Sequence, residues 1–398
     1  MNIIILDVHH PEDGRVNRHI RYMQNLGYYV FHININRYFP FLETRYFSQF
    51  GEKGYRINIG DYSQSLLNRM RLHILFFTPF LALRIVSLLK QNHQFSEIQT
   101  VIHVHDYELL MTAIYLRQFL PGINIIVYDR HEYLEIPKVN NALFDNIPRI
   151  YEKITAKLID GLVDISEIHI EKIKKFFPDS KFIVVPNYPD DILNGGERID
   201  SKLQCIDNEE LLVVYFGSLD ENLDRDISLT LKVMEKILIS YHSSKAFIGG
   251  LTSNKILLDK FRELEYKYPH RFCYLGFVPN KTVLEHTSDA IFGTFLLKSD
   301  SCSSGSSNKV FEYLRFGVIP ILKGNIENSN ALSQCSLFFS NEDNDEMILS
   351  KVSDLIHNKD KMKKMVNNSY ELGTKYTFNS VKSRYNNLYL NLLHLKNN

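Results

Sequence analysis

Residues Leu211–Phe216 read LLVVYF and are followed at once by Gly217 and Ser218. A run of apolar and β-branched residues that ends in glycine is typical of a buried parallel strand with a tight turn at its carboxyl end. Further apolar runs follow, separated by amphipathic stretches, and this alternation predicts a parallel α/β domain. The predicted strands are Lys245–Ile248, Arg271–Tyr274, Ala290–Thr294, Val318–Leu322 and Leu337–Phe339, and the predicted helices are Ile227–Ile239, Asn254–Lys267, Asn280–Thr287, Asn308–Arg315 and Asp345–His357.

The part of the chain before this strand shows the same alternation. Its predicted strands are Asn2–Leu6, Tyr29–Ile33, Thr100–His103, Asn124–Tyr128, Gly161–Ile165 and Lys181–Val185. Its predicted helices are Val16–Leu26, Leu109–Gln118, Pro148–Leu158 and Glu167–Phe176. The fold class is therefore α/β, with two successive doubly wound parallel sheets.

A break in regular structure separates the two alternations. Prolines 186 and 189 and a glycine pair at 195–196 interrupt the order, and a polar stretch continues to about Glu210. We interpret this stretch as a linker. The predicted domains are residues 1–190 and 191–377, followed by a final helix, 378–398, that carries Tyr385, Leu388, Leu392 and Leu395 roughly on one face.

Composition excludes several classes of protein. The 398 residues fit two domains, and a hydrophobic content of 44% with 23% charged residues is ordinary for a globular chain. The formal net charge is +0, which argues against a nucleic-acid partner bound through phosphate neutralisation. The four cysteines show no metal-binding spacing, and the N-terminus has no basic leader or cleavage site, so a cytoplasmic location is expected.

One segment, Leu72–Leu89, is strongly apolar. It contains Pro79 and Arg84 and has a marginal length for a membrane span. Three interpretations compete: a core helix, a helix that docks on the inner face of the membrane, and a true span. Arg69 and Arg71, just before it, fit docking on anionic lipid and fit a solvated helix end equally well.

Two loops of the second domain could hold phosphate. Gly217 and Ser218 follow a strand directly, and Arg225 lies near the start of the next helix, where a guanidinium could clamp a diphosphate. The second loop, 299–308, is rich in serine, including Ser304 and Ser307, and leads into a helix that begins at Asn308. The alternative in each case is an ordinary solvated turn.

The helix after the serine-rich loop carries two further candidates. Lys309 could add a point charge at a diphosphate, and Glu312, one turn on, could accept hydrogen bonds from a ribose diol. The competing interpretation is a Lys–Glu pair on a solvated helix face.

The first domain offers Gly14, Arg15 and His131. Gly14 would allow a ligand to approach closely after the first strand, Arg15 could contact an anion, and His131 lies just beyond a strand end. His103 and His105 share one face of another strand, but the sequence shows no third ligand at fixed spacing, so a structural role is favoured over a metal site. No metal and no cofactor is expected. The chain also has no P-loop, no GxGxxG after its first strand and no nucleophile elbow.

These motifs, in this order, resemble the retaining GT-B glycosyltransferases of family 4, whose members build bacterial surface polysaccharides such as capsule and lipopolysaccharide O-antigen. The resemblance runs nearly from end to end. It is carried by the stretches Asp13–Val16, His103–Asp106, Tyr128–Glu132, Phe216–Ser218, Leu275–Val278 and, most specifically, Asn308–Leu314 with Gly317–Pro320.

The resemblance implies two Rossmann-like domains facing a cleft, with the acceptor on the side of the first domain and a nucleotide-sugar on the second. Glu312 would hold the ribose. Lys309, Arg225, Gly217, Ser218, Ser307 and Asn308 would surround the diphosphate, and Phe277 and Val278 would lie against the base. His131 would contact the transferred sugar, and Gly14 would lie near the phosphate and the acceptor. The final helix would cross back to the first domain.

One position departs from the family pattern. Many relatives carry a further glutamate eight residues before the one that corresponds to Glu312, and here that position is Ser304. The expected activity is transfer of a sugar from a nucleoside-diphosphate-sugar, with UDP as the expected nucleotide, to a hydroxyl of a glycan or lipid-linked acceptor, with retention and without a metal. A GT-B-shaped UDP-sugar 2-epimerase and a non-catalytic subunit of a glycan-assembly complex stay open as alternatives.

Overall fold

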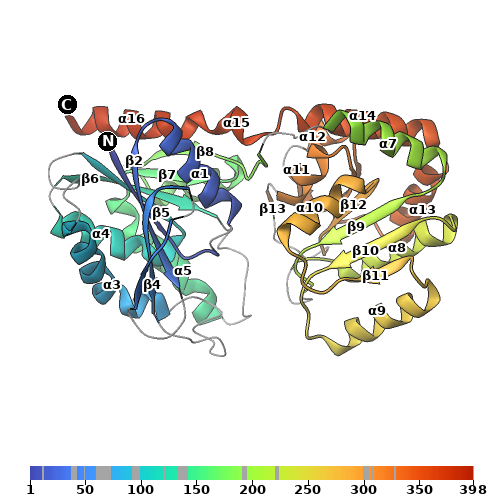
Figure 1. Cartoon of the computed structure of the whole chain (residues 1–398), viewed down its shortest axis with the longest axis horizontal. Coiled ribbons are helices and arrows are strands. Elements are labelled where there is room, and N and C mark those ends of the chain that lie inside the picture. Colours follow the sequence, from blue (N-terminus) through green and yellow to red (C-terminus); the bar gives the residue numbers. More distant parts are fainter. Residues whose placement is uncertain are drawn as a thin grey trace. The chain divides into compact units, whose positions relative to one another are not determined.

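The computed structural model describes residues 1–10, 13–36, 43–48, 50–59, 73–91, 99–120, 122–131, 142–190, 195–219, 224–298, 304–305, 308–326 and 329–397. The chain divides into two units (Figure 1). The first is Met1–Pro186 together with Val381–Asn398, and the second is Asn187–Ser380. The C-terminal residues therefore pack with the N-terminal sheet although they are the most distant from it in sequence.

The first unit is built on a sheet whose described strands follow the order β3-β4-β2-β1-β5-β6-β7-β8. All neighbouring pairs are parallel except β3 with β4. The order reverses between β1 and β5, as in a doubly wound sheet. The strands are β1 (Asn2–Asp7), β2 (Tyr29–Asn36), β3 (Thr44–Tyr46), β4 (Lys53–Asn58), β5 (Thr100–His105), β6 (Ile123–Arg130), β7 (Gly161–Asp164) and β8 (Lys181–Val184).

Helices cover both faces of this sheet (Figure 1). The apolar core on one face contains Ile4, Leu6, Ile102 and Val104, against which α3 and α4 pack. Alternation along the strands sends His103 and His105 of β5 to the opposite face, which α1 and α16 cover. The helices of this unit are α1 (Gly14–Asn25), α3 (His73–Lys90), α4 (Leu110–Phe119), α5 (Ala142–Thr155), α6 (Glu167–Ile173) and α16 (Ser383–Asn397), with α15 (Phe378–Val381) leading into the last.

The described part of the apolar segment Leu72–Leu89 belongs to α3, and its described side chains, from Thr78 on, place it largely in the core. Leu81, Ile85 and Leu89 of α3 are buried in the unit's core, whereas Phe80 and Leu83 are 56% and 61% exposed. Within the described residues, no helix combines the length and apolar character needed to cross a membrane. Arg69 and Arg71 lie outside the described residues.

The second unit has a parallel sheet with the strand order β11-β10-β9-β12-β14-β16. Numbered within the unit, this is the order 3-2-1-4-5-6 of dinucleotide-binding sheets, which reverses direction between β9 and β12. The strands are β9 (Leu212–Phe216), β10 (Lys245–Gly249), β11 (Phe272–Tyr274), β12 (Phe292–Leu296), β14 (Ile319–Lys323) and β16 (Leu337–Phe339), with the short pair β13 (Ser304–Gly305) and β15 (Asn325–Ile326) beside them.

Helices also lie on both faces of the second sheet (Figure 1). One face is covered by α7 (Gly195–Asp207), α10 (Asn280–Asp289), α11 (Asn308–Arg315) and α14 (Lys359–Gly373), and the other by α8 (Ile227–Ser240), α9 (Lys255–Lys267) and α13 (Asp345–Ile356). The short α12 (Ser329–Leu332) precedes β16. Every strand predicted for this unit is present.

The predicted linker between the domains is wrong for residues 195–207, which form α7. Ile199 and Ile206 are buried in the second core, and the ammonium of Lys202 donates to the backbone oxygen of Ala290. Burial lowers the pKa of Lys202 to about 7. The polar composition hid a helix whose few apolar residues all lie on its inner face.

Candidate functional site

The first candidate site lies where the second sheet reverses its strand order. Ligands of doubly wound sheets bind at the carboxyl ends of the two strands that flank this point, here β9 and β12. Gly217 follows β9 directly, and α11 is the helix that follows β12. The two segments singled out from the sequence therefore flank the same topological switch point.

Gly217 and Lys309 are in contact. A methyl group placed on Gly217 would lie 2.6 Å from Lys309 Cε and 3.0 Å from its Nζ. Gly217 N also donates to Gly249 O at 2.9 Å, which ties the turn to the end of β10. Glycine at this position thus makes room for the lysine side chain over the backbone of the turn.

The Lys309 ammonium is in a poor environment for a cation. Burial lowers its pKa, the neighbouring Arg225 lowers it further, and Glu312 opposes both effects. Within the described residues, Lys309 Nζ makes no hydrogen bond and no ion pair. A half-buried ammonium without an anionic contact at a switch point is suited to an anionic ligand.

Arg225 is held close by. Its guanidinium carbon lies 4.2 Å from the centre of the Phe295 ring, and Nη1 lies 2.7 Å from Asp224 Oδ1. A backbone bridge between Arg225 and Leu297 joins its loop to the end of β12. The predicted position at the start of α8 is nearly right, since the helix is capped by the next residue, Asp226, whose carboxylate accepts from Leu229 N at 2.9 Å.

Helix α11 has the predicted bounds, Asn308–Arg315. Glu312 is half-buried on the same face as Lys309, one turn away. The helix docks closely because β12 carries Gly293, where any side chain would collide with the ring of Tyr313. Tyr313 in turn donates to Thr294 O at 3.1 Å.

The other donor-side candidates are placed as follows. Ser218 accepts a hydrogen bond at its backbone oxygen from Tyr215 at 2.7 Å. Phe277 is 71% exposed after β11, and Val278 packs in the small cluster that contains Phe216. Ser304 lies in β13, and Ser307 lies outside the described residues.

The second candidate site lies at the corresponding edge of the first sheet. His9 follows β1, Asp106 follows β5 and His131 follows β6. The rings of His9 and His131 stack with centroids 4.4 Å apart, and His9 Nε2 lies 2.9 Å from Asp106 Oδ2. The carboxyl ends of neighbouring parallel strands meet at one edge, which explains this gathering.

Asp106 fixes the backbone beside His131. Its φ of 69° lies in the left-handed region, which a non-glycine residue adopts at a cost of about 1–3 kcal/mol. Asp106 N donates to Asp129 O at 3.0 Å, and Asp106 Oδ1 accepts from His131 N at 3.4 Å. Strain of this kind is typical of functional sites.

The prediction that Arg15 contacts an external anion is not supported by this geometry. Its guanidinium is buried and donates to Asp129 Oδ1 through Nε at 3.0 Å and Nη2 at 2.7 Å, and to Val185 O through Nη1 at 2.6 Å. Gly14 is the exposed first residue of α1, where a methyl group would meet only the flexible Arg18 guanidinium, at 3.0 Å. Gly14 therefore lies at the N-terminus of the helix that follows β1, and its contact with a ligand stays a prediction.

The two stacked histidines, His9 and His131, differ in charge. Burial opposes protonation of His9, but Asp106, Asp13 and Asp7 outweigh it and raise its pKa to about 9. Burial and the charge of His9 lower the pKa of His131. Near pH 7 a His9 imidazolium thus stacks on a neutral His131 ring.

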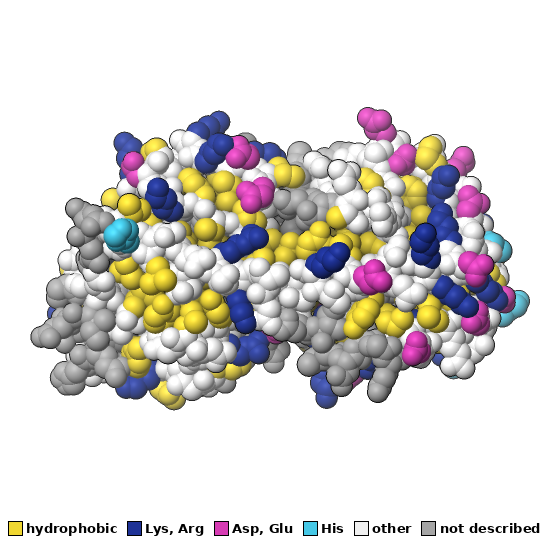
Figure 2. Space-filling view, turned by 90° about the horizontal axis from the view of Figure 1, so that it is seen from above, with side chains coloured by type: hydrophobic (Ala, Val, Ile, Leu, Met, Phe, Trp, Pro, Cys, Tyr) yellow, Lys and Arg dark blue, Asp and Glu magenta, His cyan; other side chains and the backbone are white. Residues whose placement is uncertain are grey.

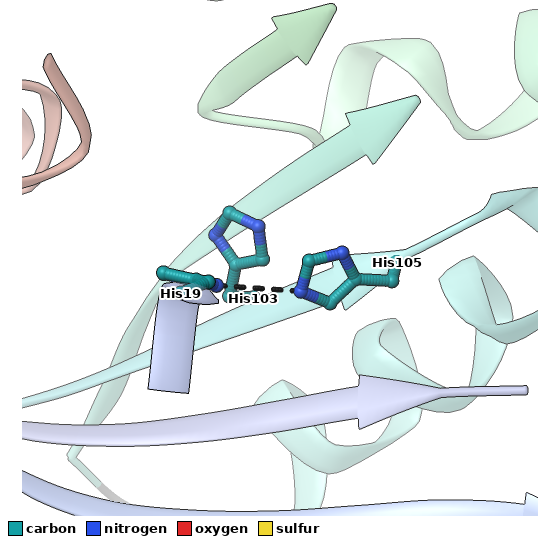
Figure 3. A group of neighbouring side chains, drawn as sticks. All are labelled: His19, His103 and His105. Atoms are coloured by element: carbon teal, nitrogen blue, oxygen red, sulfur yellow. Dashed lines mark hydrogen bonds between the residues drawn. The ribbon is translucent and has the colours of Figure 1, made fainter. Parts of the chain in front are cut away.

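Among the described residues of this unit, three groups of side chains lie close enough together to hold a metal ion: His19, His103 and His105, shown in Figure 3; His9, Asp106 and His131; and His105, Asp129 and His131. The nitrogens of the first group already contact each other or the Tyr389 hydroxyl, with His19 Nδ1 and His105 Nε2 3.3 Å apart. A metal would have to displace these hydrogen bonds.

Sequence reasoning missed His9, His19 and Tyr389, and it gave no separate role to Asp106 and Asp129, which lie in the stretches His103–Asp106 and Tyr128–Glu132 that carry the resemblance. His19 lies one turn after Arg15 on the buried face of α1, and Tyr389 lies one turn after Tyr385 on α16. The i, i+4 spacing of polar side chains on an otherwise apolar helix face was the available signal.

Comparison with known proteins gives a consistent fold. No protein-family model matches the sequence, and no curated protein matches it. Among solved structures, sucrose-phosphate synthase from Thermosynechococcus elongatus matches with a TM-score of 0.73 and 12% identity over 99% of this chain and 100% of that one. A UDP-forming trehalose-phosphate synthase from Burkholderia xenovorans in complex with glucose-6-phosphate matches at 0.68 and 11%, over 99% and 100%.

An E. coli trehalose-6-phosphate protein bound with UDP-2-fluoro glucose is also similar, with a TM-score of 0.69 and 13% identity over 98% of this chain and 99% of that one. These likenesses over nearly full length show that the chain has the GT-B fold, with two Rossmann-like domains. At such identities they establish the fold alone.

Proposed function

We propose that this chain is a retaining glycosyltransferase that uses a nucleoside-diphosphate-sugar. The observation that carries the proposal is the half-buried Lys309 ammonium beside Gly217, at the switch point of a dinucleotide-type sheet. A diphosphate supplies the anion that this position lacks, and Glu312 one turn on is placed to bind a ribose diol.

The chemistry follows from where charge develops. As the bond from the sugar to the diphosphate breaks, the sugar approaches an oxocarbenium ion and negative charge grows on the leaving group. Fixed positive groups aimed at that charge lower the barrier. Lys309, Arg225 and the N-terminal N–H groups of α11 are the groups that this chain offers, so the proposal assigns no role to a metal.

The first unit would receive the acceptor and the transferred sugar. Gly14 and His131 lie at the carboxyl-end edge of its sheet, as the resemblance to family 4 implies. Attack would come from the face of the leaving group, with a phosphate oxygen taking the acceptor proton. Retention of anomeric configuration is the expected outcome.

The donor and acceptor are the finer part of the proposal. The solved relatives' names include UDP-2-fluoro glucose and glucose-6-phosphate, which favours UDP-glucose as the first donor to test and a sugar phosphate as one acceptor. The motif resemblance favours a glycan or lipid-linked acceptor of surface-polysaccharide synthesis. In both cases a sugar hydroxyl would attack.

One assay separates the alternatives. The full chain is incubated with UDP-sugars alone, then with glucose-6-phosphate or with a panel of glycans and lipid-linked sugars, and products are resolved by mass spectrometry. We expect a new glycoside and UDP only when an acceptor is present. A new UDP-sugar without acceptor would identify an epimerase, and UDP binding without turnover in any pair would identify a binding subunit.

Contact with a membrane stays a prediction, supported by the two exposed apolar side chains Phe80 and Leu83 on α3. Figure 2 shows the side of the molecule that carries α16, where basic side chains are scattered among acidic and uncharged ones, and the prediction for α3 rests on its own exposed side chains. Vesicles containing anionic lipid should co-float with the wild-type chain and less with a Phe80→Ser, Leu83→Ser variant. Equal flotation of both, or none, would exclude this role for α3.

A further inference from the structure

A continuous line of hydrogen bonds crosses the buried face of the first unit and ends at His131. Its first part starts at Asp129, whose Oδ2 lies 3.2 Å from His103 Nε2. His103 Nδ1 lies 2.7 Å from the Tyr389 hydroxyl oxygen, and the same oxygen lies 2.8 Å from His19 Nε2. All four side chains are fully buried.

Its second part leads from α1 to the strand ends. His19 Nδ1 lies 3.3 Å from His105 Nε2, a contact drawn in Figure 3. His105 Nδ1 lies 2.7 Å from His131 Nε2. Within the described residues, His131 Nδ1 has no hydrogen-bond partner, and the side chain is 8% exposed.

Proton counting fixes the direction of the first part. Asp129 is ionised, because the always-charged Arg15 donates twice to it and Tyr385 donates once, at 3.0 Å. A carboxylate only accepts, so His103 Nε2 carries a proton. A neutral imidazole has a single N–H, so His103 Nδ1 accepts from Tyr389.

The same rule fixes the rest. The Tyr389 hydroxyl has given its one proton to His103, so its oxygen accepts from His19 Nε2–H. His19 Nδ1 is then the acceptor for His105 Nε2–H, and His105 Nδ1 is the acceptor for His131 Nε2–H at 2.7 Å. Asp129 Oδ2 lies 3.6 Å from His105 Nδ1, which is too long for a hydrogen bond that would place the proton there instead. Neutral rings are expected because burial lowers the pKa of all four histidines, and because neighbouring histidines or Arg15 oppose their protonation.

We infer that this line of hydrogen bonds holds His131 as the Nε2–H tautomer, so that the Nδ1 lone pair of His131 accepts a hydrogen bond from a ligand hydroxyl. Tyr389 of the C-terminal helix is then a positioning residue for His131. Every other donor and acceptor in the line is used by a neighbour, which leaves Nδ1 as its one open end. That the hydroxyl belongs to the bound sugar rests on the proposed function, whereas the tautomer does not.

Histidine NMR on the full-length chain tests the tautomer without any substrate. Two-bond ¹H–¹⁵N spectra at pH 7–8 distinguish a nitrogen that carries hydrogen from a bare one, and His131→Gln assigns the signal. We expect a protonated Nε2 and a bare Nδ1. A protonated Nδ1, a fast average of both forms, or a spectrum changed by added Zn²⁺ and restored by a chelator would overturn the inference.

A pair of tyrosine variants tests the role of Tyr389. Tyr385 lies on the same helix and is equally buried, but its hydroxyl donates only to Asp129, at the start of the line, and to no histidine in it. Tyr389→Phe should make the His131 signals average between tautomers and lower kcat about tenfold, whereas Tyr385→Phe should leave the tautomer pattern of His131 unchanged. An unchanged His131 pattern in Tyr389→Phe would remove its positioning role.

The test of the proposed function and the test of the His131 tautomer can fail independently. If no donor is turned over by the wild-type chain, the proposed function fails while the NMR result still decides the tautomer. If Tyr389→Phe does not fold, the wild-type spectrum alone decides whether Nδ1 is bare.

Discussion

Lys309 carries positive charge where water solvates it poorly. Replacement with alanine should relieve that burial cost, so the free energy of unfolding should stay the same or rise by up to about 1 kcal/mol. Binding of UDP should weaken at least about 30-fold, because a charge-assisted contact to phosphate is lost. Calorimetry measures both, with Lys281→Ala on the exposed face of α10 as the control. Unchanged UDP affinity in Lys309→Ala would contradict the donor site.

A substitution at Gly14 tests whether a ligand approaches the first unit at the start of α1. Its methyl group in Gly14→Ala would meet only the movable Arg18 guanidinium, so stability should change by less than about 0.5 kcal/mol. If a sugar approaches this backbone, kcat/KM should still fall about tenfold. Asn25→Ala at the other end of α1 serves as the control. Wild-type kinetics for Gly14→Ala would remove Gly14 from the site.

Among elements, α16 joins the end of the chain to the first sheet. Leu388 is buried against Gly161 of β7, where a methyl group on the glycine would lie 3.3 Å from Leu388 Cδ2. Leu388→Ala should destabilise the first unit by about 2–5 kcal/mol. Leu390, which is 49% exposed on the same helix, should tolerate alanine. Denaturant unfolding checks both, and UDP affinity should survive, because the proposed donor site lies in the second unit.

Element by element, the sequence predicted what local patterning decides. Every strand of the second sheet and the bounds of α11 followed from apolar runs and their punctuation. The strands β3 and β4 were missed because their sequences, TRY and KGYRIN, lack an apolar run. Helix α7 was missed because its polar residues outnumber the few apolar ones that it buries.

For the candidate sites too, residues marked by a local sequence pattern could be predicted and residues brought together by long-range contacts could not. Gly217, Lys309 and Glu312 could be found because a strand-end glycine and a helix start are local signals. His19 and Tyr389 were missed, because the i, i+4 spacing on each helix does not show that the two side chains meet across 370 positions of sequence. The burial of Arg15 was also missed, because the sequence does not show that Asp129 faces it.

For the molecule as a whole, the histidines of the first unit make stability depend on pH. Burial opposes protonation of His9 and His32, but Asp106 and Asp7 outweigh it and raise the pKa of these two histidines to about 9. Their ion pairs therefore stabilise the fold fully below about pH 6.5, and this stabilisation is lost as the pH rises toward 9. Burial lowers the pKa of His19 and His105 well below 6.5, so acidification protonates them only in the unfolded chain and destabilises the fold.

The free energy of unfolding should therefore be highest near pH 6.5 to 7. At both pH 5 and pH 9 it should be smaller, by an amount on the order of a few kcal/mol. Urea unfolding at the three pH values measures it. His242→Gln, at an exposed position of the second unit, should leave the profile unchanged. A flat profile would contradict the charge states assigned to the histidine cluster.

The most direct test of the donor site is a crystal structure of the chain with UDP. We expect the diphosphate to lie within hydrogen-bonding distance of Lys309 Nζ and over the backbone of Gly217, with the ribose against Glu312. Nucleotide density at any other place, with the turn after β9 and the start of α11 unoccupied, would contradict the account.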